Sequence, residues 1–189
     1  MKPAKMKMRI VFIHSTNPYV DYDSITNYIR GIMKVFGDKC SFYGRSDHRM
    51  IPISGPENFE FVPLLFRHAN PFMPATLGYQ YHMLANRHLI NGNDSVLSVH
   101  QVEWAVPLLY PKKIGPTVLT IHGASKFLRI ATKNRAKIIH HEMSDRLAIK
   151  RADRVILVSR DAYDFYCNRY PKIRRKFIFV PTFVDQGLF

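Results

Sequence analysis

The chain has 189 residues, and 47% of them are hydrophobic, which fits one globular domain and excludes a disordered chain. Lysine and arginine number 28 against 14 aspartate and glutamate residues, so the formal net charge is +14. Such a charge suits an anionic partner, either nucleic acid, an acidic membrane face or a phosphorylated small molecule. A solvated basic surface, or one matched by an acidic neighbouring domain, is the alternative.

Apolar runs and helical patterns alternate along the whole chain. In chain order the sequence predicts a strand at 9–14, a helix at 24–36, strands at 39–43 and 59–62, a helix at 79–89, a strand at 95–99, a helix at 103–110, a strand at 117–121, a helix at 134–151, a strand at 154–158, a helix at 160–170 and a strand at 176–180. The alternation predicts an α/β fold, a Rossmann-like, doubly wound and mostly parallel sheet of about seven strands with helices on both faces.

Local signals define several of these boundaries. Gly37 is the expected stop of the first helix, and Ser159 is the expected N-cap of the last. Pro63 is expected to end the third strand, and Pro107 to interrupt the helix at 103–110.

Two features predict a cytoplasmic protein. Cys40 and Cys167 lie far apart without metal-ligand spacing, which is typical of free thiols in a reducing compartment. The basic start is followed only by the short apolar run 10–13, too short for a signal peptide or a membrane span.

The candidate chemistry lies at the ends of strands. His14, His100 and His122 each follow an apolar run, so we expect them to share one edge of the sheet, where open α/β sheets bind ligands. Singly, each histidine is more often structural than catalytic. After His122, Gly123 leaves room for a close substrate, and Ser125 and Lys126 are expected to begin a helix that offers N–H groups to an anion.

Other motifs are absent or weak. Neither G-x-G-x-x-G nor G-x-x-x-x-G-K-[ST] occurs, so dinucleotide oxidoreductases and P-loop NTPases lose their main support. His140-His141-Glu142 lacks the spacing of a helical metal pair, and no metal site is expected. The basic run Arg174-Arg175-Lys176 is interpreted as a contact to phosphate or lipid headgroups, or as a solvated turn.

Three stretches together carry a family resemblance. They are Thr120-Ile121-His122-Gly123, the run from Asp145 to Ser159, and the run from Phe177 to Asp185. In this order they resemble the amino-terminal half of GT-B glycosyltransferases, most closely the family 4 (group 1) type.

The resemblance implies residues 1–180 as an acceptor-side Rossmann-like domain and 181–189 as the start of a hinge to a donor-binding domain. It implies retaining, metal-independent transfer from a nucleotide-sugar, which is a co-substrate, so no cofactor is expected. His122 matches the histidine near the reacting sugar and is the predicted catalytic residue. The predicted substrate-binding residues are Asn17, Asp21, Tyr22, His100, Gly123, Ser125 and Lys126.

Two positions depart from the family pattern. Asp21-Tyr22 stands where the family usually has Gly-Gly, and an acidic side chain there opposes phosphate contact by this loop. The hinge, usually Pro-Asn-Gly-Val-Asp, begins here as Pro181-Thr182-Phe183.

The leading hypothesis is therefore the acceptor half of a glycosyltransferase of the hexosyltransferase type, inactive on its own. Its expected partners are its own donor domain or a donor subunit, a sugar, glycan, lipid-linked or phosphorylated acceptor, and an anionic membrane face on which it would be peripheral. A non-catalytic Rossmann-like module that binds an anionic ligand is the alternative, and a nucleic-acid-binding domain rests on charge alone.

Overall fold

The structure, a computed structural model, describes residues 9–15, 24–46, 60–65, 75–90, 92, 94–123 and 132–181. The strands are β1 (Arg9–Ile13), β2 (Cys40–Ser46), β3 (Glu60–Leu65), β4 (Ser95–Val99), β5 (Thr117–Ile121), β6 (Arg154–Leu157) and β7 (Phe177–Phe179). The helices are α1 (Ser24–Phe36), α2 (Ala75–Asn86), α3 (Val102–Leu109), α5 (Arg135–Arg151) and α6 (Arg160–Arg169), with 3-10 turns η1 (Gly37–Lys39), η2 (Arg87–Leu89) and η3 (Pro171–Lys176).

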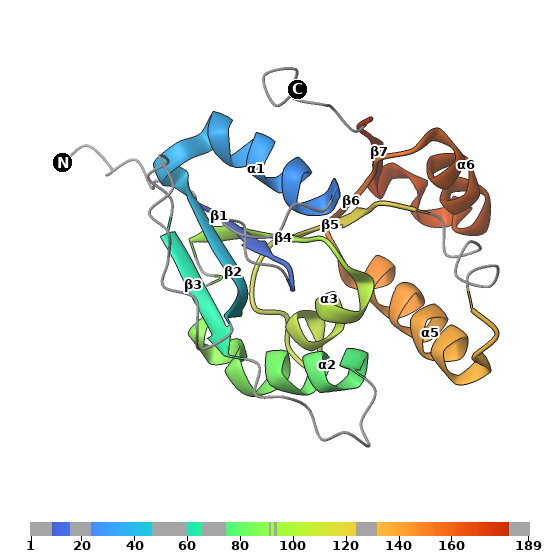
Figure 1. The fold of residues 1–189 in the computed structure, drawn as a ribbon. Helices are drawn as coiled ribbons and strands as arrows, with labels where there is room; N and C mark the ends of the chain where they lie inside the picture. The colour runs from blue at the N-terminus through green and yellow to red at the C-terminus, as the bar shows by residue number, and fades with distance from the viewer. Residues whose placement is uncertain are drawn as a thin grey trace.

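The strands form one parallel sheet. Its seven strands run in the order β3-β2-β1-β4-β5-β6-β7 (Figure 1). After β1, strands β2 and β3 are added in turn on one side of it. The chain then crosses to the other side of β1, where β4, β5, β6 and β7 follow in order. The order therefore reverses between β1 and β4, which is where doubly wound sheets bind their ligands. The predicted Rossmann-like α/β fold is confirmed.

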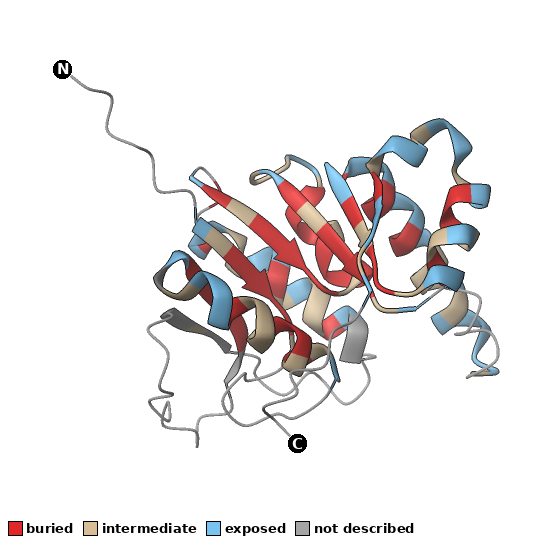
Figure 2. Ribbon diagram, turned by 90° about the horizontal axis from the view of Figure 1, so that it is seen from above, coloured by how far each residue is buried: buried red, intermediate tan, exposed pale blue. Residues whose placement is uncertain are grey.

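Helices cover both faces of the sheet. On one face α1 buries Ile29 and Met33 against Phe12 of β1 and Phe42 of β2. On the other face α2, α3, α5 and α6 share a larger core, and Figure 2 shows the buried residues concentrated in the strands and on the inner sides of the helices. Trp104 of α3 is the largest fully buried side chain of this core. The two helix layers therefore pack against the strands whose ends carry the candidate site residues.

Two prolines do not act as the sequence predicts. Strand β3 runs through Pro63, because β3 is an edge strand with only one neighbour to bond. Helix α3 runs through Pro107, whose missing N–H would have bonded the carbonyl of Glu103. Nε2 of Gln80 donates to that carbonyl instead, at 2.9 Å, so the helix continues without an orphaned acceptor.

Other boundaries also differ from the predictions. Strand β2 ends at Ser46 where the sequence predicted 43, and α2 begins at Ala75 where it predicted 79. The expected caps are confirmed: Gly37 has φ +50°, and Oγ of Ser159 accepts a hydrogen bond from the N–H of Ala162 at 3.2 Å. In the described parts of the chain, no helix combines the length and the apolarity needed to cross a bilayer.

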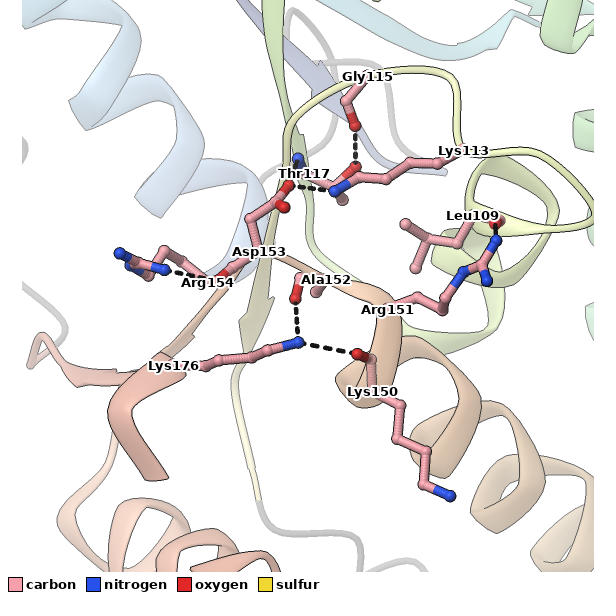
Figure 3. Close-up of polar contacts among 10 residues, drawn as sticks. All are labelled: Leu109, Lys113, Gly115, Thr117, Lys150, Arg151, Ala152, Asp153, Arg154 and Lys176. Atoms are coloured by element: carbon pink, nitrogen blue, oxygen red, sulfur yellow. Dashed lines mark hydrogen bonds and ion pairs between the residues drawn. The ribbon is translucent and has the colours of Figure 1, made fainter. Parts of the chain in front are cut away.

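The amino ends of β5, β6 and β7 are fixed by polar contacts (Figure 3). Nζ of Lys176 donates to the carbonyl oxygens of Lys150 and Ala152 at the end of α5, both at 2.8 Å. Oδ2 of Asp153 accepts from the backbone N–H of Thr117 at 2.7 Å. Lys176 therefore satisfies carbonyls that the helix leaves unpaired, and its ammonium is engaged within the fold.

Candidate functional site

Three histidines meet at the switch point of the sheet. His14 follows β1, His100 follows β4 and His122 follows β5, and these strands are neighbours in the sheet. The ring centroids of His14 and His100 are 6.4 Å apart, and those of His100 and His122 are 5.5 Å apart. The structure brings the three rings together, as the strand-end pattern predicts, whereas their roles stay predictions.

His100 connects the strand ends through hydrogen bonds. Its Nδ1 lies 3.2 Å from Nε2 of His122, and its Nε2 lies 3.2 Å from Oγ of Ser98. Burial, together with the neighbouring His122 and His14, holds the pKa of His100 well below its ordinary value. A neutral imidazole has one donor and one acceptor nitrogen, so His100 links Ser98 to His122 and orients the His122 ring.

Helix α1 closes the other side of the histidine pair. The ring of Tyr28 lies edge-on to His122 at 5.4 Å and to His100 at 5.9 Å between centroids. Burial raises the pKa of the Tyr28 phenol, which therefore stays neutral. A Cβ placed on Gly123 would meet no atom of the described residues within 4 Å, so none of these residues fills the space beside His122 there.

The other predicted site residues lie outside the described part of the chain. These are Asn17, Asp21, Tyr22, Ser125 and Lys126.

A cavity of about 310 Å³ opens beside His122. Small-molecule sites in proteins begin at about 300 Å³, so the cavity suits a ligand the size of one ring. Its walls come from the end of β4, from α3, β5 and α5, and from α6. The lining residues are His100, Gln101, Val102, Glu103, Thr120, Ile121, His122, Gly123, Lys137, His141 and Tyr166.

An ion pair crosses the cavity wall between α3 and α5. Oε1 of Glu103 lies 2.6 Å from Nδ1 of His141. Burial opposes the charge of both groups, but their hydrogen bond and mutual attraction prevail. The pKa of His141 is consequently raised and that of Glu103 lowered, so each group favours the charged form of the other.

A second carboxyl lies behind this pair. Asp145 of α5 is fully buried, and its Oδ1 accepts a hydrogen bond from the Tyr166 hydroxyl at 3.0 Å. Burial raises the pKa of Asp145 to about 6, although the bond from Tyr166 and the nearby His141 act in the opposite direction.

Sequence reasoning did not assign Glu103, His141, Asp145 or Tyr166 to the site. A signal for the first was present, because a lone carboxylate interrupts the apolar run 102–109. His141 and Asp145 are four residues apart and therefore share a face of α5, yet only the packing shows that this face turns inward.

Comparison with known proteins identifies the family. The model of Glycosyltransferase Family 4 matches residues 33–187. None of the curated protein sequences matches. Among solved structures, Anabaena Alr3699/HepE in complex with UDP-glucose has a TM-score of 0.61 at 11% identity, and the match covers 96% of this chain and 45% of that one.

Two further structures are similar. Alr3699/HepE in complex with UDP and glucose has a TM-score of 0.61 at 12% identity, over 96% of this chain and 46% of that one. The amino-terminal domain of Candida albicans trehalose-6-phosphate phosphatase has a TM-score of 0.58 at 11% identity, over 95% of this chain and 49% of that one. The chain thus spans about half the length of these structures, whose likeness shows the shared fold. The family model covers most of the sequence, so the chain belongs to glycosyltransferase family 4.

Proposed function

We propose that the chain is the acceptor-side half of a retaining, metal-independent glycosyltransferase. It works with a donor-binding half, which supplies a nucleotide-sugar across the cleft, and it presents the acceptor hydroxyl to the transferring hexose. UDP-glucose is the first donor to test, because Anabaena Alr3699/HepE is seen with it. In this proposal His122 lies next to the reacting sugar.

One observation carries the proposal. His122 stands at the carboxyl end of a central strand, is oriented by the buried His100 and opens on a cavity of about 310 Å³. A purely structural histidine would not need an open space of that size beside its ring. The family membership makes glycosyl transfer the reaction to assign to this arrangement.

The test is glycosyl transfer by the full-length protein that contains this chain. With UDP-glucose and a panel of sugar and lipid-linked acceptors, we expect release of UDP and a glycoside product that keeps the anomeric configuration of the donor. EDTA should leave the rate unchanged. Residues 1–189 alone should show no turnover, because half a cleft cannot hold the donor. Nucleotide-sugar binding without turnover on any acceptor would favour a non-catalytic module.

The charge of the chain supports peripheral binding to an anionic membrane, where a lipid-linked acceptor would lie. Helix α5 exposes Arg135, Lys137, Arg146 and Lys150. In cosedimentation with vesicles, we expect binding to rise with the phosphatidylserine fraction and to fall as salt is raised from 0.05 to about 0.5 M, since screening shortens the electrostatic range. Vesicles of phosphatidylcholine alone are the control. If binding changes neither with the lipid charge nor with the salt concentration, the membrane part of the proposal is wrong.

A further inference from the structure

Glu103 lines the cavity beside His122, and one of its carboxyl oxygens is buried without a hydrogen-bond partner among the described residues. The residue is 6% exposed, lies in the first turn of α3 and lines the cavity. Its Oε1 is engaged by His141 at 2.6 Å. Its Oε2 is buried and finds no hydrogen-bond partner among the described residues. A buried polar atom in this state costs free energy unless a ligand or solvent bonds to it.

The chemistry of the missing partner follows from the charge of Glu103. The hydrogen bond with His141 keeps its pKa below the ordinary value despite burial. An ionised carboxylate only accepts hydrogen bonds, so its partner must be a donor. A phosphate oxygen at this position would bring two acceptors and two negative charges together. A sugar hydroxyl donates, and it forms the stronger, charge-assisted type of bond with a carboxylate.

We propose that the cavity between α3, α5 and the end of β5 holds the acceptor sugar ring, and that Oε2 of Glu103 selects it by accepting a hydrogen bond from one ring hydroxyl. This inference rests on the proposed function, since it names the acceptor class for that site. The volume of about 310 Å³ admits one ring. His122 forms part of the same lining, so the ring is held beside the histidine assigned to the reacting sugar.

The contacts of Glu103 with His141 and Gln80 hold its carboxylate in one position. The 2.6 Å bond between Nδ1 of His141 and Oε1 fixes the carboxylate, so that Oε2 keeps one orientation. The carbonyl of Glu103 is fixed as well, by the 2.9 Å bond from Gln80. A carboxylate held at both its side chain and its backbone loses little entropy on binding, which favours selectivity for one hydroxyl.

The first experiment measures binding to the unmodified full-length protein, with and without UDP. Saturation-transfer NMR titrations would use the methyl glycosides of glucose, galactose, mannose and N-acetylglucosamine, followed by each monodeoxy analogue of the best binder. We expect one glycoside to bind, and one deoxy analogue to bind at least about tenfold more weakly, as the loss of a bond to a charged group implies. The inference is overturned if no glycoside binds, or if every monodeoxy analogue binds as well as its parent.

The second experiment links that hydroxyl to Glu103. Glu103→Gln keeps the side-chain shape but replaces a carboxylate oxygen by an amide. We expect it to weaken the parent glycoside about tenfold and to bind the critical deoxy analogue no more weakly than the parent. Asp164→Asn is the matched control, because it removes an exposed carboxylate on α6 that pairs with Arg160 at 3.3 Å. Equal discrimination of hydroxyls by wild type and Glu103→Gln overturns the assignment of Glu103, and thermal unfolding shows that both variants are folded.

Failure of this inference is distinguishable from failure of the proposed function. If glycosides bind through Glu103 but no donor sugar is ever transferred, the sugar pocket is supported and the transferase assignment is contradicted. If transfer proceeds and Glu103→Gln leaves the acceptor KM unchanged, the transferase assignment is supported and the proposed role of Glu103 is contradicted.

Discussion

In the proposed transferase, replacing His122 with alanine should reduce kcat about a hundredfold or more while leaving the fold intact. Positioned acid–base or charge-stabilising groups usually contribute factors of this size. The fold should survive because His122 is half-buried at a strand end and lies outside both hydrophobic core clusters. Initial rates of UDP release at saturating donor and acceptor, with circular dichroism of the same samples, would measure both effects.

The expected loss follows from how His122 is held. The 3.2 Å contact with the neutral His100 fixes the ring plane, and Tyr28 packs edge-on against it. The imidazole therefore keeps one orientation towards the cavity, which lowers the reorganisation needed as charge develops on the transferring sugar. His122→Gln can still reach His100 with its amide. We expect it to retain the hydrogen bond but to recover only a small part of the rate.

His88→Ala is the matched control. His88 is an exposed histidine of η2, which precedes β4 and so lies at the amino edge of the sheet, opposite the site. Its loss should leave kcat within about twofold, as expected for a surface substitution away from the site. If His122→Ala keeps the wild-type rate, His122 is a structural residue and the catalytic assignment is wrong.

The sequence predicted the fold well where local and global signals agree. The run Thr117–Ile121 is apolar and β-branched because it is buried on both faces, and it forms β5 within the predicted bounds. Predictions failed where a tertiary contact changes a local rule. Pro107 is tolerated because a distant Gln80 satisfies the carbonyl of Glu103, and nothing near Pro107 in the sequence announces that contact.

The site was predictable to the extent that it lies at strand ends. Parallel strands carry their carboxyl ends to one edge, so His100 and His122 had to be neighbours if their strands were adjacent. The charged wall of the cavity was not predictable, because it depends on which faces of α3 and α5 meet. Glu103 and His141 are 38 positions apart in the chain, and only helix packing brings them within 2.6 Å.

Asp145→Asn should stabilise the protein at neutral pH and remove part of its pH dependence. The pKa of the buried carboxyl is raised to about 6, against an ordinary value of 3.8. A raised pKa in the fold means that the protonated form is favoured there. The contribution of Asp145 to stability is therefore fully present below pH 3.8 and is lost as pH rises through about 6. The two values correspond to up to about 3 kcal/mol at pH 7.5.

Other groups titrate in the same pH range, so the comparison must be made between variants. His141 and Arg169 lower the pKa of Asp145 and Glu103 raises it, and His141 and Glu103 themselves have shifted pKa values. Subtracting the free energy of unfolding of wild type from that of Asp145→Asn removes the pH dependence that these other groups contribute equally to both proteins. Urea unfolding from pH 4 to pH 8 should show this difference growing with pH, with its steepest rise at about pH 5, midway between the two pKa values.

The Asn variant isolates the charge because it keeps the contact. Its amide oxygen can still accept the hydrogen bond that the Tyr166 hydroxyl now gives at 3.0 Å. Its amide N–H₂ takes the place of Oδ2, which has no partner among the described residues, so part of the gain is offset by an unsatisfied donor. Asp164→Asn, which removes an exposed carboxylate of α6, is the matched control. A pH-independent difference for Asp145→Asn would mean that Asp145 is solvated in solution, and the assignment of a buried carboxyl behind the Glu103–His141 pair would be wrong.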